Sequence, residues 1–211
     1  MSFLKSISIA AAVAFLSPAQ LSAQTQQVRE APEHHQHSAD SDIQTLQQMR
    51  RGGNVIFFRH ERTDVMRRDD PLIDLTDCST QRNLSVAGVA NSVQTGDYIR
   101  ILDIPIDEVL SSPVCRSFET ARLAFGRVEV GDGLFSDWNT DTRDGPTRAQ
   151  DFRSLVTRSL TPGRNVVMVG HFPGGQYYGV HLEEGDAIIL TSDGNGGSQM
   201  VGVIGAHRWG D

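Results

Sequence analysis

Val55-Ile56-Phe57-Phe58-Arg59-His60 is an apolar run that ends abruptly in a cation and an imidazole. Four consecutive large apolar residues predict a strand that is buried on both faces, as in a parallel sheet. A cation and an imidazole are unfavourable in an apolar core, but Arg59 and His60 are expected at this position if the strand ends at a binding site. In open α/β sheets, ligands bind at the carboxyl ends of the strands. The run therefore predicts strand 55–60 and a site for an anion at its end.

Two further segments place similar side chains after predicted strands. Residues 165–171 read Asn-Val-Val-Met-Val-Gly-His, a second buried strand that ends in His171. Arg116 follows a short strand at 109–112, where the chain turns into a helix. If these strands are parallel neighbours, His171, Arg116 and the Arg59-His60 pair emerge at one edge of the sheet.

Two arginines and two imidazoles around one space favour a phosphoryl group. Guanidinium groups match phosphate oxygens in bidentate fashion. A neutral histidine can itself attack phosphorus. Because His60 and His171 lack Cys or carboxylate ligands at the usual spacings, the sequence indicates no metal and no other cofactor.

The rest of the chain alternates between helices and strands, which predicts βαβ units and a largely parallel sheet. The last two strands flank a Gly-rich turn, which predicts a hairpin at an edge. A polar loop spans 61–83. We expect helices from Asp42 to Gly52-Gly53, after Ser85 with Val86, Val89, Ala90 and Val93 at helical spacing, at 116–125 and at 147–160, and further strands at 128–130, 187–191 and 200–204.

The N-terminus reads as a targeting segment. Residues 1–23 have a positive start, an apolar centre and a small-residue exit, which predicts a signal peptide cleaved after Ala23 or Ala19, with an uncleaved membrane anchor as the alternative. Residues 24–41 are polar and predict a disordered leader, whose histidine run is a solvated linker or a weak metal binder. The folded domain then spans 42–211, and the expected location is the periplasm or the exterior.

The net charge bears on the possible binding partners, and the cysteines bear on disulfide formation. The formal net charge is −7, which argues against general nucleic-acid binding because that depends on Lys and Arg neutralising phosphates. The two cysteines, Cys78 and Cys115, are expected to pair if the protein is exported, and two separate buried thiols are the alternative.

Four sequence blocks resemble the ordered signatures of the histidine phosphatase (phosphoglycerate mutase-like) superfamily, over about residues 45–210. They are Arg59-His60-Glu61-Arg62-Thr63, Gln81-Arg82-Asn83-Leu84-Ser85-Val86-Ala87-Gly88, Ser111-Ser112-Pro113-Val114-Cys115-Arg116-Ser117-Phe118-Glu119-Thr120-Ala121, and Val169-Gly170-His171. The resemblance implies a three-layer α/β/α sandwich. It also implies that His60 is the nucleophile, that Arg59, Arg116 and His171 hold the phosphoryl oxygens, and that a carboxylic acid protonates the leaving oxygen.

Other residues of these blocks have open roles. Arg62 and Thr63 follow the nucleophile and are expected to contact substrate, although Arg62 also fits a solvated charge run with Arg67 and Arg68. Arg82 and Asn83 are interpreted as structural, with substrate contact as the alternative.

The sequence departs from the family pattern twice. The usual Gly after the Arg-His pair is Glu61, which either crowds the pocket, acts as the acid or points outward. The usual acidic Glu is absent, and the candidates in its place are Asp137, then Asp141, then Glu61. A loop carboxylate without a catalytic role is the alternative for Asp137.

The stretch from Ala121 to Val169 is short, so the chain is similar to the short, phosphohistidine-phosphatase-like branch. We therefore expect a metal-independent phosphomonoesterase acting on an exported or envelope phosphate ester, such as a lipopolysaccharide sugar phosphate. The alternative is a non-catalytic phosphate-binding module of the same fold. A mutase is a weaker third option, because an open site would let water take the phosphoryl group.

Overall fold

The computed structural model describes residues 39–131, 133–135, 144–206 and 209 of the 211-residue chain. All the described residues belong to one compact unit, which the structure delimits as His37–Asp211. The predicted signal peptide, most of the predicted leader, and the acid candidates Asp137 and Asp141 lie outside the described residues.

Helices and strands alternate along the second unit, as predicted. In chain order they are α2 (Ala39–Arg51), β1 (Asn54–Arg59), the 3-10 turn η1 (Cys78–Thr80), α3 (Val86–Ile101), β2 (Ile106–Ser111), α4 (Cys115–Phe125), β3 (Glu129–Val130), α5 (Gly145–Ser159), β4 (Asn165–Gly170), α6 (Pro173–Gln176), β5 (Ala187–Ser192) and β6 (Ser198–Ile204). In this part of the chain, no helix combines the length and the apolar character needed to cross a bilayer.

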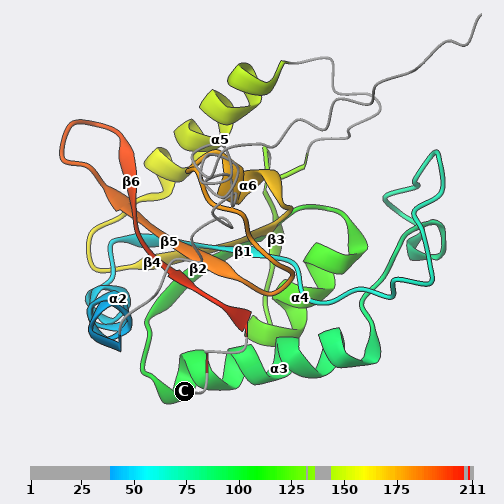
Figure 1. The fold of residues 1–211 in the computed structure, drawn as a ribbon, viewed down its shortest axis with the longest axis horizontal. Helices are drawn as coiled ribbons and strands as arrows, with labels where there is room; N and C mark the ends of the chain where they lie inside the picture. Colours follow the sequence, from blue (N-terminus) through cyan, green and yellow to red (C-terminus); the bar gives the residue numbers. More distant parts are fainter. Residues whose placement is uncertain (1–38, 132, 136–143, 207–208, 210–211) are drawn as a thin grey trace, which may run out of the picture. The chain divides into compact units, whose positions relative to one another are not determined.

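The strands form one mixed sheet in the order β3-β2-β4-β1-β5-β6 (Figure 1). The first four strands of this order run parallel to one another. Strand β5 runs antiparallel to both β1 and β6. Strands β5 and β6 form the predicted hairpin, with β6 at one edge of the sheet. Since β2, β4 and β1 are parallel neighbours, their carboxyl ends meet at one edge, which is where the sequence placed the site.

Helices cover both faces of the sheet, so the predicted sandwich is confirmed (Figure 1). Strand β1 shows why: Ile56 and Phe58 face one layer, and Val55 and Phe57 face the other. One core joins the sheet to α2, α3 and α4, and the other joins it to α5. Each fully buried apolar side chain contributes about 1.5–3 kcal/mol, so β1 contributes strongly to the stability of both cores.

Helix α3 begins after the predicted Ser85 cap, whose hydroxyl accepts a hydrogen bond from the Gly88 N–H. The apolar residues that revealed this helix nevertheless face solvent: Val86 is 91% exposed, and Val89 and Val93 are also exposed. The inner face instead carries Gly88, Ser92, Thr95, Gly96 and Ile99. Small residues are needed there because a Cβ at Gly96 would lie 2.0 Å from the carbonyl oxygen of Ala124 in α4.

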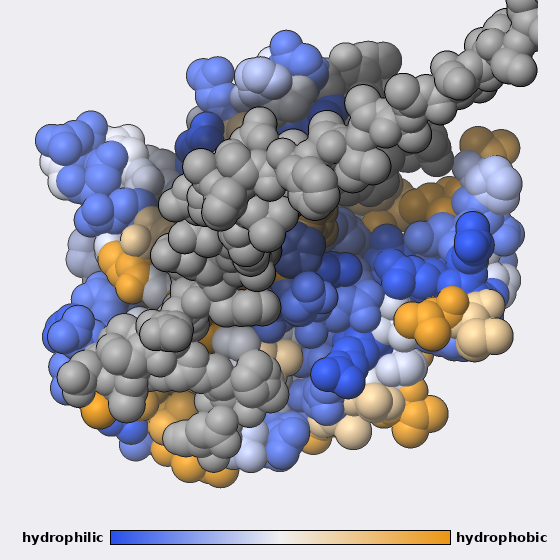
Figure 2. Space-filling model, viewed as in Figure 1, coloured by the Kyte–Doolittle hydropathy of each residue, from blue (hydrophilic) through white to orange (hydrophobic). Residues whose placement is uncertain are grey.

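Exposed apolar side chains also occur on the loop before α3. Val65, Met66 and Leu72 are each at least 80% exposed. In Figure 2 such hydrophobic groups interrupt a described surface that is otherwise mainly hydrophilic. Single exposed apolar residues are common on soluble proteins and require no special explanation.

Two local predictions need correction. Helix α2 begins at Ala39, three residues before the predicted cap Asp42, so the helix takes in the end of the predicted leader. The short elements η1 and α6 were not predicted, because each is under five residues and has no periodic pattern.

Cys78 and Cys115 are joined as a disulfide, which confirms the predicted pairing.

Candidate active site

The parallel pairing of β1 and β4 brings the two histidines together. Arg59 lies opposite Gly170 in the register, so the next residue of each strand is a histidine. The rings of His60 and His171 lie 5.5 Å apart, centre to centre. The backbone N–H of His60 also donates to the carbonyl oxygen of Gly170 at 3.0 Å. The sheet therefore delivers both imidazoles to one point.

The ring of His60 is held in one tautomer and in the neutral form. Its Nδ1 lies 2.9 Å from the carbonyl oxygen of Glu61, so Nδ1 carries the proton and donates it. The lone pair then resides on Nε2. Burial lowers the pKa of His60 to about 3, and the nearby Arg116, Arg59 and Arg82 guanidinium groups add to this shift. The ring is therefore neutral at ordinary pH, the form in which it can attack phosphorus.

His171 has a similar environment. Burial holds its pKa well below the usual value, and the neighbouring His60 and arginines reinforce the shift. Its Nε2 lies 2.9 Å from the hydroxyl oxygen of Ser112, in the turn between β2 and α4. Ser112 is fully buried, so this contact holds the ring in one orientation.

The two predicted clamp arginines frame the histidines. Arg59 donates to the Leu182 carbonyl oxygen at 2.7 Å, and Arg116 donates to Asp69 at 3.0 Å. Burial lowers the pKa of Arg116, while the Asp69 carboxylate opposes that shift. Among the described residues, the buried Nε atoms of both arginines have no hydrogen-bond partner. Buried N–H donors without a partner, in a cationic cluster, are suited to binding an anion.

Arg82, interpreted from the sequence as structural, also belongs to this cluster. Its NH1 atom lies 2.5 Å from the Thr63 hydroxyl oxygen and 3.3 Å from Oε1 of Glu184. Its charge contributes to lowering the pKa of both histidines. The resemblance block at 81–88 contained this arginine, so the signal was present in the sequence.

Glu184 and Asp69 are the site carboxylates that the sequence did not reveal. Glu184 precedes β5 and accepts hydrogen bonds from the hydroxyl and the backbone N–H of Thr63, at 2.8 and 3.1 Å. Asp69 accepts from the backbone N–H of Arg82 as well as from Arg116. Neither residue has a motif, and only the folded chain brings them to the arginines.

Thr63 therefore lies in the cluster, whereas Arg62 is exposed and uses its carbonyl oxygen to accept from the N–H of Ser85. Asn83 donates to the carbonyl oxygen of Cys78 and supports the loop.

Glu61, the residue in place of the family's usual Gly, has its carboxylate buried away from bulk water. Its Oε2 lies 3.4 Å from the side-chain nitrogen of Asn91 in α3 and 3.3 Å from the backbone nitrogen of Arg62. Burial raises the pKa of Glu61. Gly185, at a φ of +91°, leaves room for it, because a Cβ there would lie 2.8 Å from the Glu61 carboxylate. The hydrogen bonds of the Glu61 carboxylate are thus with α3 and with neighbouring backbone.

The disulfide and its surroundings fasten the loop at 61–83 to the start of α4. Cys115 immediately precedes Arg116, and its partner Cys78 lies in η1. The fully buried Gln81 accepts from the backbone N–H of Cys115 at 2.8 Å. The loop residues Asp69 and Arg82 are thereby held against Arg116.

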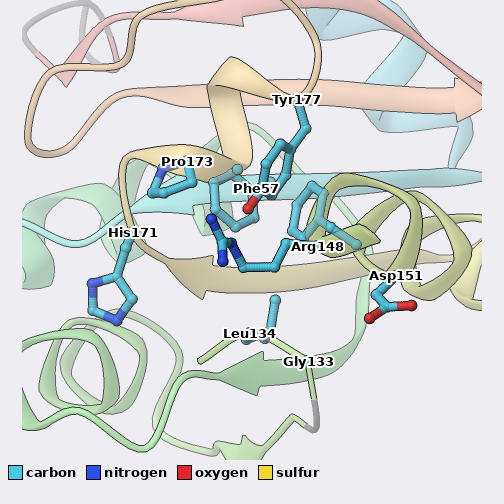
Figure 3. Close-up of a pocket in the computed structure, with 10 residues that line it drawn as sticks. Phe57, Gly133, Leu134, Arg148, Asp151, His171, Pro173 and Tyr177 are labelled. Atoms are coloured by element: carbon cyan, nitrogen blue, oxygen red, sulfur yellow. The ribbon is translucent and has the colours of Figure 1, made fainter. Parts of the chain in front are cut away.

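A small cavity of about 30 Å³ adjoins His171 on the α5 side of the sheet (Figure 3). Its lining includes the apolar side chains of Phe57, Leu134 and Pro173, together with Tyr177. In Figure 3 the Arg148 guanidinium reaches across the cavity, and Asp151 lies at the end away from His171. The cavity therefore places apolar side chains and both charged residues, Arg148 and Asp151, on the side of His171 that faces α5.

Within the part of the chain that the structure describes, no group of three or more His, Cys, Asp or Glu side chains is arranged to hold a metal ion. Arg59, Arg82 and Arg116 supply positive charge at the site.

No protein-family model matches the chain, and no curated protein sequence matches it. Solved structures do. The protein histidine phosphatase SixA, complexed with tungstate, aligns over 73% of this chain and 97% of its own, with a TM-score of 0.52 and 18% identity.

Phosphoserine phosphatase from Entamoeba histolytica aligns in two complexes. A mutant with phosphoserine covers 74% of this chain and 98% of its own (TM-score 0.53, 14% identity), and the complex with 3-phosphoglyceric acid covers 71% and 95% (TM-score 0.54, 14% identity). The strand order, the helices on both faces and these matches agree: the chain has the histidine phosphatase, phosphoglycerate mutase-like fold.

Proposed function

We propose that the protein is a metal-independent phosphomonoesterase that works through a phosphohistidine intermediate. The observation that carries the proposal is a pair of adjacent neutral imidazoles, His60 and His171, whose pKa values are both lowered by the nearby Arg59 and Arg116. Phosphoryl transfer requires mainly positioning and neutralisation of the phosphoryl oxygens, which this arrangement supplies.

In the first step, Nε2 of His60 attacks phosphorus, the ester P–O bond breaks, and the leaving oxygen takes a proton from a carboxylic acid. In the second step, water attacks the phosphohistidine, a carboxylate accepts a proton from that water, and the P–N bond breaks to release phosphate. Arg59, Arg116 and His171 bind the phosphoryl oxygens throughout.

Asp137 remains our first candidate for the acid, followed by Asp141 and Glu61. The buried contacts of Glu61 with Asn91 and backbone favour a supporting role for it. Asp137→Asn should slow turnover of an alkyl phosphate, whose leaving oxygen needs a proton, far more than that of an aryl phosphate. If Asp137→Asn turns over the alkyl phosphate as fast as the wild type does, Asp137 is not the acid.

The proposed substrate is an exported or envelope phosphate ester, including a lipopolysaccharide sugar phosphate. The N-terminal pattern at residues 1–23 supports a periplasmic or secreted location. The short stretch between α4 and β4 supports an open site suited to large substrates. A panel of phosphorylated sugars, peptides and lipid head groups, assayed on the mature protein, tests this choice.

The alternative is a phosphate-binding module without turnover, and Glu61 in place of the family's Gly is the observation that favours it. Phosphate release from an aryl phosphate decides between the two. We expect release by the wild type and none by His60→Ala. Phosphate binding without release by the wild type would support the binding module.

A further inference from the structure

Glu184 connects the arginines of the pocket to the turn after the nucleophile. Its Oε1 lies 3.3 Å from NH1 of Arg82 and 3.8 Å from NH2 of Arg59. Both of its oxygens also accept hydrogen bonds from Thr63. The side chain is 19% exposed, so these contacts hold it in place while part of it remains open to solvent.

The charge of the cluster is only partly positive. Arg59, Arg82 and Arg116 supply the cations, and Glu184 and Asp69 each pair with at least one of them. A phosphoryl group bound by Arg59 therefore has the Glu184 carboxylate as a near neighbour of the same sign. Like charges at such separations repel even in a dielectric close to that of water.

The geometry points to Glu184 as a counter-charge that limits how tightly the pocket holds phosphate, and so promotes release of the product. This inference rests on the proposed function only in that the pocket binds a phosphoryl group. Glu184 is a positioning and affinity-setting residue that acts through Arg59 and Arg82, and it does not transfer a proton in this account.

A purely structural role makes the opposite prediction. If Glu184 only held Thr63 and Arg82 in place, its loss would weaken phosphate binding. If it acts as a counter-charge, its loss leaves the arginines more cationic and strengthens binding. The sign of the change in phosphate affinity therefore separates the two roles.

Glu184→Gln is the test, because the amide keeps the size of the side chain and an oxygen that can accept from Thr63. The dissociation constant of inorganic phosphate is measured by calorimetry on the full chain at low salt. We expect phosphate to bind at least about tenfold more tightly to Glu184→Gln than to the wild type. The difference should shrink as salt is added, because ions screen partly exposed charges.

Glu183→Gln is the matched control, because Glu183 is the neighbouring carboxylate, is 75% exposed and pairs with His181 instead of the cluster. Its phosphate affinity should equal that of the wild type. Glu184→Ala serves as a second variant, and it should also bind phosphate more tightly. Unchanged or weaker phosphate binding by folded Glu184→Gln overturns the inference.

Phosphohistidine formation, measured on the same wild-type preparation, separates this inference from the proposed function. If the wild type forms no phosphohistidine but Glu184→Gln binds phosphate more tightly, the proposed catalytic function is wrong and the counter-charge role of Glu184 is supported. Phosphohistidine formation without tighter binding does the reverse. Failure of both the wild type and folded Glu184→Gln to bind phosphate contradicts both.

Discussion

Nδ1 of His60 lies 2.9 Å from the carbonyl oxygen of the next residue, Glu61. This local contact sets the tautomer of the ring and leaves the lone pair on Nε2. Because the acceptor is a backbone oxygen, the arrangement does not depend on which side chain follows the histidine. The replacement of the family's Gly by Glu61 is thus compatible with an oriented nucleophile.

The two site histidines should stay neutral across the physiological range. Burial and the surrounding guanidinium groups lower the pKa of His60 to about 3 and that of His171 well below its usual value. Nuclear magnetic resonance of the imidazole C–H signals should show no titration of either ring between pH 7.5 and 5. A midpoint near pH 6.5 for His60, assigned with His60→Gln, would contradict the buried cationic environment.

Glu61→Gln should stabilise the protein at neutral and higher pH. Burial raises the pKa of Glu61 above 4.5, its usual value, so the unfolded chain loses this proton at lower pH than the folded protein. The folded state therefore loses stability as pH rises through that window. Urea unfolding at pH 4 and pH 8 should show a gain for the variant at pH 8 and little difference at pH 4. An equal gain at both pH values would rule out ionisation as the cause.

The disulfide should contribute to both stability and the site. It closes a loop with a sequence separation of 37 residues, for which the chain-entropy model gives about 3–4 kcal/mol. Cys78→Ser combined with Cys115→Ser should lower the free energy of unfolding by about that amount, as measured in urea. The variant should also bind phosphate more weakly, because Arg116 follows Cys115 directly. Unchanged phosphate affinity would show that Gln81 and Asp69 hold Arg116 without the disulfide.

Ser112→Ala should impair turnover while the protein stays folded. The change removes the hydroxyl 2.9 Å from Nε2 of His171 and leaves a buried ring nitrogen without that partner. A cost of about 1–1.5 kcal/mol corresponds to a roughly tenfold fall in kcat/KM.

Ser111→Ala is the control for Ser112→Ala. Ser111 is equally buried, but its hydroxyl donates to the carbonyl oxygen of Ser112 and not to His171. Equal losses in the two serine variants would mean that the turn, and not the contact with His171, matters.

The sequence was sufficient for features that depend on local pattern. The apolar runs that end at His60 and His171 predicted two buried strands and their meeting point, because the ends of parallel strands coincide. The Ser85 cap predicted the start of α3, since capping is also a local interaction.

The remaining features depend on contacts between distant segments. Glu184 meets Thr63 across 121 positions of the chain, and no spacing rule connects them. The inner face of α3 was missed because close packing against α4 selects small residues such as Gly96, which hydrophobic periodicity does not register.

Trapping the covalent intermediate shows whether His60 carries the phosphoryl group during turnover. The wild type is mixed with a ³²P-labelled aryl phosphate, quenched in alkali within one turnover, and mapped by mass spectrometry. We expect acid-labile, alkali-stable phosphate on His60 and none on a folded His60→Ala variant. Phosphate release by the wild type without label on His60, or equal release by His60→Ala, would contradict it.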